Sequence, residues 1–186
     1  MDHTPAFDHL FLGAGAMKAG TTWLYRLLDS HPDVFFSLEK EIHYFYARYV
    51  DRNVLRDQVR LENVRSKYLR IDPATSSAEA VRKRLRWSAA YLDGPLDDDW
   101  YRGLFQFRRA ERYVSDFSNL YALLPAEAWS KIANRTEHLR VLYTMRDPIK
   151  RLLTGDFEMK FHVAPKALDG VAHRVQNPQM FGAVCL

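Results

Sequence analysis

The sequence has a single cysteine among its 186 residues, and this residue, Cys185, stands next to the C-terminus. One thiol excludes an internal disulfide framework and a cysteine-rich zinc site. Its scarcity favours a reducing compartment, so we expect a cytoplasmic protein.

Glycine and proline are also sparse, at 8 residues each, which excludes collagen-like and low-complexity chains. No apolar run approaches the roughly 20 residues that a membrane-spanning helix needs. The first four residues carry no basic segment, and Gly13 and Gly15 interrupt the first apolar stretch, so the start of the chain is a poor signal peptide. We therefore expect a protein without a membrane span.

No charge sign dominates, since 27 Lys and Arg face 23 Asp and Glu, a net charge of +4. This balance suits an anionic ligand but does not require nucleic acid, which we do not expect as a partner. Between Arg48 and Arg86 there are eleven basic and five acidic residues. We interpret that stretch as a solvated helical surface in preference to a patch for an acidic substrate.

A chain of 186 residues, 47% of them hydrophobic, is expected to form one globular domain over residues 1–186. The apolar pattern favours alternating strands and helices. Strands are expected over residues 9–14, 34–36, 112–117 and 139–145. Helices are expected from Thr21 or Thr22 to His31, with a hydroxyl residue as N-cap, over parts of 48–86 and over 149–162. We therefore predict an α/β fold with a central, mainly parallel sheet flanked by helices in three layers, with its ligand site at the carboxyl ends of the strands.

The strongest chemical signal is the glycine-rich segment from Gly13 to Trp23, which lies between the first predicted strand and the first predicted helix. Backbone N–H groups and a helix N-terminus can hold a phosphate there. Lys18 precedes Gly20 by two residues, whereas a Walker A loop has Gly-Lys directly before Ser or Thr. The segment also lacks the third glycine of a dinucleotide-binding fingerprint. A structural turn would explain the glycines but not the lysine inside the loop.

Residues 18–24, Lys-Ala-Gly-Thr-Thr-Trp-Leu, resemble the 5′-phosphosulfate-binding loop of the sulfotransferases, which use 3′-phosphoadenosine 5′-phosphosulfate (PAPS). Residues 146–154 resemble the 3′-phosphate motif of that family, with Thr154 where a serine is usual. Threonine keeps the hydroxyl that such a contact needs. Residues 29–34 and 40–45 are similar to the branch acting on carbohydrates, including heparan sulfate, and to bacterial members.

Weaker similarity covers residues 98–101 and 116–121, where Asn119 replaces a usual proline. The whole resemblance spans about residues 11–161. Family members usually continue further, so the resemblance implies a single sulfotransferase-like domain that is incomplete at its C-terminus. The apolar end of the chain favours self-association into a homo-oligomer.

The resemblance implies a P-loop-like fold, PAPS as co-substrate, no metal, and a small-molecule or carbohydrate acceptor with a hydroxyl or amine. It implies that Lys18 contacts the 5′-phosphosulfate and stabilises the departing phosphate. It also implies that Glu41 is the catalytic base, with His43 as the alternative base. The donor site that it implies consists of Lys18, Ala19, Gly20, Thr21, Thr22, Trp23, Arg146 and Thr154.

Two other functions stay open at this point. A P-loop nucleotide kinase shares the strand–loop–helix start and requires ATP and Mg²⁺, although the Lys–Gly order disfavours it. A non-catalytic nucleotide-binding fragment of a sulfotransferase binds the donor without transferring its sulfuryl group.

Overall fold

The computed structural model of this chain describes residues 7–72, 74–145 and 181–185. Five strands form one sheet in the order β2-β3-β1-β4-β5, and every neighbouring pair is parallel. The strands are β1 (Phe7–Gly13), β2 (Val34–Phe36), β3 (Tyr113–Phe117), β4 (Thr136–Met145) and β5 (Phe181–Cys185). The α/β fold expected from the sequence, with a central parallel sheet, is therefore confirmed.

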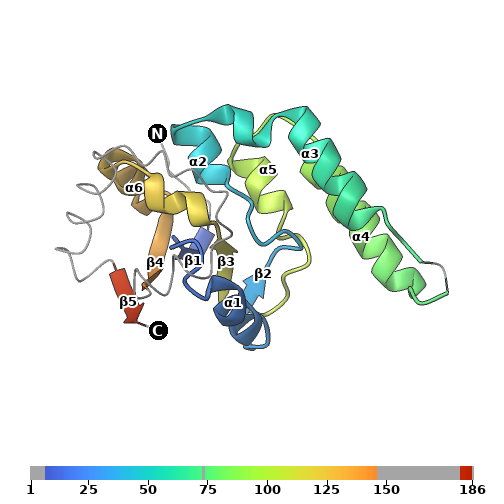
Figure 1. The fold of residues 1–186 in the computed structure, drawn as a ribbon, viewed down its shortest axis with the longest axis horizontal. Helices are drawn as coiled ribbons and strands as arrows, with labels where there is room; N and C mark the ends of the chain where they lie inside the picture. Colours follow the sequence, from blue (N-terminus) through green and yellow to red (C-terminus); the bar gives the residue numbers. More distant parts are fainter. Residues whose placement is uncertain (1–6, 73, 146–180, 186) are drawn as a thin grey trace.

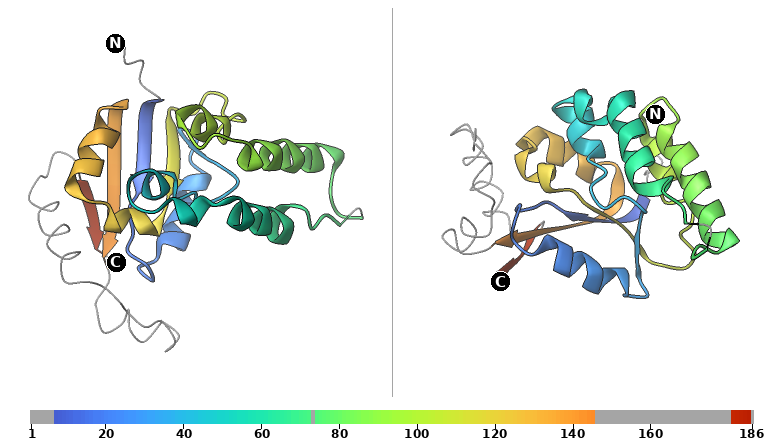
Figure 2. Two further views of the ribbon diagram at one scale, coloured as in Figure 1. Left: turned by 90° about the horizontal axis from the view of Figure 1, so that it is seen from above. Right: turned by 45° about the vertical axis from the view of Figure 1, so that its right-hand side comes forward.

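Helices cover both faces of this sheet, α1 on one side and α2 and α6 on the other (Figures 1 and 2). In Figure 1 the helices α3 and α4 project away from the sheet as a hairpin. The helical elements are α1 (Thr21–Asp29), α2 (Tyr44–Tyr49), η1 (Arg52–Leu55), α3 (Asp57–Asn63), η2 (Val64–Tyr68), α4 (Ala78–Leu92), α5 (Asp98–Gly103), η3 (Asn119–Leu123) and α6 (Ala126–Ala133). None of the described helices is long and apolar enough to cross a bilayer.

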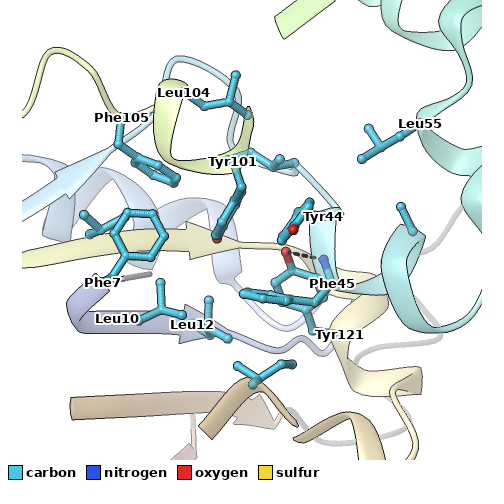
Figure 3. Close-up of a cluster of buried hydrophobic side chains, with 14 of the residues drawn as sticks. Phe7, Leu10, Leu12, Tyr44, Phe45, Leu55, Tyr101, Leu104, Phe105 and Tyr121 are labelled. Atoms are coloured by element: carbon cyan, nitrogen blue, oxygen red, sulfur yellow. Dashed lines mark hydrogen bonds between the residues drawn. The ribbon is translucent and has the colours of Figure 1, made fainter. Parts of the chain in front are cut away.

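Alternation along β1 divides the apolar side chains between the two faces. Leu10 and Leu12 join the larger core, whereas Phe11 packs with the smaller cluster beneath α1. The larger core is rich in aromatic rings, and Tyr44 and Tyr101 stack with their centroids 4.3 Å apart (Figure 3). This core fixes α2 and α5 against the sheet, and α2 follows directly on the segment that carries Glu41 and His43.

The first helix begins where the sequence predicts, but its expected hydroxyl N-cap is wrong. The N-cap residue is Gly20, at φ 80°, and no side chain caps the helix. Glycine adopts this left-handed conformation without the clash that a Cβ would cause. The hydroxyls of Thr21 and Thr22 are instead within hydrogen-bond distance of Lys40 Nζ.

Gly13, the last residue of β1, is packed too closely for any side chain. A Cβ at Gly13 would lie 2.5 Å from Cγ of Phe117, whose ring packs against Phe11 and Phe36. We expect Gly13→Ala to lower the free energy of unfolding by about 2 kcal/mol, because the ring must move within a packed cluster. Chemical denaturation measures this loss. Gly103→Ala is the control, since nothing lies within 4 Å of its added Cβ, and equal stability of the two variants would contradict the prediction.

Candidate functional site

The glycine-rich loop lies at the carboxyl end of β1 and is held against β4. Ala14 and Ala16 donate from their backbone N–H groups to the carbonyls of Leu142 and Thr144, at 2.8 and 3.0 Å. The N–H and the hydroxyl of Thr144 both donate to the carbonyl of Gly15, at 3.0 and 2.8 Å. The loop is thus an extension of the parallel pairing beyond the last residue of β1.

Backbone conformation within the loop is unusual. Gly15 has φ 116°, and a Cβ there would lie 3.2 Å from Cβ of Ala122, which explains why this position needs glycine. Lys18 has φ 61°, a conformation that residues with a side chain seldom adopt. Such strained positions cluster at ligand-binding sites. These two positive φ values mark the loop as a candidate binding site.

Of the residues expected at the donor site, those from Lys18 to Trp23 lie together on this loop and on the first turn of α1. Lys18 is exposed, and among the described residues its ammonium has no hydrogen-bond or ion-pair partner. Ala19 is fully buried, and Trp23 is 60% exposed. The first turn of any α-helix leaves N–H groups without acceptors inside the helix, so α1 presents donors beside the lysine. Lysine, amides and hydroxyls at one helix N-terminus are the groups that bind phosphate.

Arg146 and Thr154, expected to hold a 3′-phosphate, lie outside the described residues. The strand before them, β4, ends at Met145, and its residue Thr144 bonds to the loop at Gly15. Arg146 therefore follows directly on a strand whose end is adjacent to the donor loop.

Glu41 and His43 lie together on the segment between β2 and α2. Glu41 Oε2 is 3.6 Å from His43 Nε2, and Glu41 Oε1 is 3.7 Å from Lys40 Nζ. The same Nζ lies 3.4 Å from Thr21 Oγ1 and 3.3 Å from Thr22 Oγ1. Lys40 thus connects the first turn of α1 to the carboxylate of Glu41.

Burial shifts the pKa values of Glu41 and His43 in opposite directions. It raises the pKa of Glu41, against the opposing effect of the Lys40 ammonium. Burial, and secondarily the charge of Lys67, lowers the pKa of His43 to about 4. The imidazole is therefore neutral near pH 7, and a carboxylate with a raised pKa is the better proton acceptor of the two.

Glu39 holds the start of the segment between β2 and α2 in place. Glu39 is 7% exposed, and its carboxylate accepts hydrogen bonds from Lys67 Nζ at 3.0 and 3.1 Å and from the Tyr68 hydroxyl at 3.1 Å. Lys67 and Tyr68 belong to η2, so this helical element packs directly against the segment that carries Glu41. Glu39 is occupied by these bonds, which leaves Glu41 as the more available carboxylate.

The sequence did not single out Lys40 or Asp116 as site residues. Lys40 stands in a quoted motif, but its contact with Thr21 and Thr22 joins residues 18 and 19 positions apart. Asp116 is 1% exposed at the end of β3, and Ser118 and Tyr121 donate to it. The available signals were the similarity over residues 40–45 for Lys40 and over residues 116–121 for Asp116, and neither gives a role to these side chains.

Asp116 is expected to make stability depend on pH. Burial raises its pKa to about 6, against the hydrogen bonds that Tyr121, Ser118 and Tyr101 donate to it. The folded state therefore holds this proton up to a higher pH than the unfolded state does, and the resulting stabilisation is lost as pH rises through about 6. The free energy of unfolding of the wild type, relative to Asp116→Asn, should fall by roughly 2 kcal/mol between about pH 4.5 and 7.5. Urea denaturation across this range measures it, and a pH-independent difference would refute it.

Among the described residues, no group of three or more His, Cys, Asp and Glu side chains is arranged to hold a metal ion. The available polar groups at this end of the sheet are cations, hydroxyls and backbone amides beside the Glu41 carboxylate and the His43 imidazole. Such a set can bind a phosphorylated or sulfated group and accept a proton next to it.

Comparisons with known proteins bear on the family and the fold of the chain. A model of the sulfotransferase family matches residues 11–177. Among solved structures, the chain is similar to a sulfotransferase from Alicyclobacillus acidocaldarius, with 20% sequence identity and a TM-score of 0.56, over 95% of this chain and 72% of that one. No curated protein matches significantly. The structural likeness supports the fold, and the family match extends over most of the sequence. The chain therefore belongs to the sulfotransferase family.

Proposed function

We propose that this protein transfers a sulfuryl group from PAPS to a hydroxyl or amine of a small-molecule or carbohydrate acceptor. The observation that carries the proposal is the set of contacts from Thr21 and Thr22 through Lys40 to Glu41. It brings a phosphate-binding helix start and a proton acceptor to the same edge of the sheet. A transfer reaction requires this proximity, because donor and acceptor must meet in line.

Lys18 would bind the 5′-phosphosulfate and stabilise the negative charge that develops on the leaving phosphate. The N–H groups of Ala19 and Gly20, and those of Thr21 and Thr22 with their hydroxyls, would bind the same group. The exposed indole of Trp23 is available to stack on an adenine ring. Arg146 and Thr154 would bind the 3′-phosphate, the arginine through its planar fork of donors.

Glu41 would accept the proton of the acceptor as its oxygen or nitrogen attacks sulfur. A bond forms from the acceptor to sulfur while the bond from sulfur to the bridging oxygen breaks. 3′-phosphoadenosine 5′-phosphate leaves with the electron pair of that bond. No metal is needed in this scheme, because Lys18 and the helix N-terminus supply the electrostatic stabilisation.

His43 would orient the Glu41 carboxylate, from which its Nε2 lies 3.6 Å away. It remains the alternative base if Glu41 proves dispensable. A cytoplasmic location and a single domain are further parts of the proposal, the former supported by the lone cysteine.

The proposed donor site is tested by titration calorimetry of the whole chain with 3′-phosphoadenosine 5′-phosphate, beside ATP with Mg²⁺. We expect the bisphosphate to bind and Arg146→Ala to lose most of that binding. Preference for ATP with Mg²⁺ would favour a nucleotide kinase. Bisphosphate binding without sulfuryl transfer to any acceptor in a panel of sugars, phenols and amines would favour a non-catalytic module.

A further inference from the structure

We propose that Ser118 and Tyr121, both hydrogen-bonded to the buried carboxylate of Asp116, are positioning residues that hold the Glu41–His43 segment in place for sulfuryl transfer. This inference rests on the proposed function. It concerns side chains that would not touch either substrate. They act through the backbone that carries the proposed base.

The N–H groups of Ile42, His43 and Phe45 all bond to this cluster. Ile42 donates to Asp116 itself, and His43 donates to Ser118 Oγ at 3.0 Å. Phe45 donates to the Tyr121 hydroxyl at 3.5 Å (Figure 3). The segment that follows Glu41 is therefore attached to the end of β3 and to η3 at several points.

Asp116 fixes the direction of these bonds. Ser118 Oγ donates to one Asp116 oxygen at 2.7 Å, and the Tyr121 hydroxyl donates to the other. Each hydroxyl has a single proton, so once that proton points at the carboxylate, the oxygen presents its lone pairs elsewhere. The lone pairs then accept from His43 and Phe45. The carboxylate thus turns two rotatable hydroxyls into oriented acceptors.

The segment needs such bonds because no regular structure holds it. The residues from Ser37 to His43 lie between β2 and α2, and His43 has φ 60°, a left-handed conformation that is unfavourable for a residue with a Cβ. No side chain caps α2, which begins at the next residue. Without the bond to Ser118, His43 would relax toward an ordinary conformation, and Glu41 would move with it.

Burial strengthens the hydrogen bonds of the Asp116 cluster. Asp116, Ser118 and Tyr121 are each at most 1% exposed, so water does not compete for these hydrogen bonds. Among the described residues, no cation pairs with Asp116, and its charge is compensated by hydroxyl and amide donors. A buried carboxylate without a cation costs stability. One of its hydrogen bonds comes from Tyr101 on α5, and the others come from Ser118, Tyr121 and Ile42, which lie at or beside the candidate site.

The test compares Ser118→Ala and Tyr121→Phe with two matched controls. Ser115→Ala removes a buried hydroxyl from β3, the strand that carries Asp116, and this hydroxyl has no hydrogen-bond partner among the described residues. Tyr91→Phe removes a hydroxyl from another buried tyrosine, on α4. Two readouts are measured: amide hydrogen exchange at Ile42, His43 and Phe45, and steady-state sulfuryl transfer from PAPS to the acceptor identified in the panel.

We expect the His43 amide to exchange at least about tenfold faster in Ser118→Ala, and the Phe45 amide in Tyr121→Phe, because each loses its acceptor. In both variants kcat should fall about tenfold or more, whereas KM for PAPS and binding of the bisphosphate product stay near wild type. A general loss of stability would instead accelerate exchange throughout the chain. Both controls should match the wild type in exchange at these amides and in kcat.

Unchanged exchange at these amides, or equal acceleration in the controls, would overturn the positioning role. An unchanged kcat beside accelerated exchange would also overturn it, since the segment would then move without consequence for transfer. Wild-type protein that binds no bisphosphate would contradict the proposed function itself. The two failures are separate, because exchange is measured without any ligand.

Discussion

Glu41→Gln is expected to lower the rate of sulfuryl transfer by roughly 10²–10⁴-fold, the usual contribution of a general base. Glutamine is similar in size and keeps hydrogen-bonding capacity toward Lys40 and His43, but it cannot take the proton from the acceptor. The donor loop does not include this side chain. Binding of 3′-phosphoadenosine 5′-phosphate should therefore stay within about twofold of the wild type, as calorimetry would show.

The pH dependence of the wild-type rate offers a second sign of the same role. A base works as the carboxylate, so the rate falls as pH drops through its pKa. Burial raises the pKa of Glu41, and this fall should therefore begin at a higher pH than for an exposed glutamate. The residual rate of Glu41→Gln should lack that fall.

Glu137→Gln is the matched control for this variant, because Glu137 is exposed near the start of β4, toward the opposite edge of the sheet. It should transfer at the wild-type rate. Wild-type turnover in Glu41→Gln would exclude Glu41 as the base. His43→Gln would then be expected to lose activity in its place.

Lys18→Ala is expected to weaken binding of the bisphosphate product by about 10- to 100-fold, since a hydrogen bond between a charged group and phosphate contributes about 1.5–3 kcal/mol. The rate should fall as well, because the lysine would also stabilise the leaving phosphate. Calorimetry measures the first effect, and single-turnover release of the bisphosphate measures the second.

Lys83→Ala is the control for the loss of one positive charge. Lys83 lies on α4, in the hairpin that projects away from the loop (Figure 1). Its removal should change bisphosphate binding by less than about twofold at moderate salt. If Lys18→Ala binds the bisphosphate and turns over as the wild type does, the assignment of the loop as the donor site is wrong.

Much of the fold could be predicted from the sequence, because its signals are local. An apolar run followed by glycines predicts β1 and its loop, and helical spacing after Thr21 predicts α1. The short strand β2 and the strands β3 and β4 were also predicted at nearly their observed positions. The start of α1 was predicted, yet its cap was not, since Gly20 occupies the N-cap position and the hydroxyls of Thr21 and Thr22 contact Lys40 instead of capping the helix.

The candidate site was only partly predictable. The residues of the donor loop were identified because they are consecutive, and Glu41 and His43 were identified through resemblance to a family. The secondary structure of residues 39–45 could not be predicted from the sequence. The part before α2 has no regular structure, and hydrogen bonds to side chains distant in the sequence hold it in place. Their partners, including Lys67, Ser118 and Tyr121, lie 28 to 76 positions away.

The sequence by itself determined the α/β class and indicated the proposed donor loop, because both depend on residues that are neighbours in the chain. The proposed base came from resemblance to a family. The tertiary structure decided how these parts meet. It brought Lys40 to Thr21 and Thr22, and it buried Asp116 beneath the segment that carries Glu41. Such contacts depend on the pairing of β1 with β3 and on the packing of α2 against the sheet. Spacing along the chain does not encode that long-range geometry.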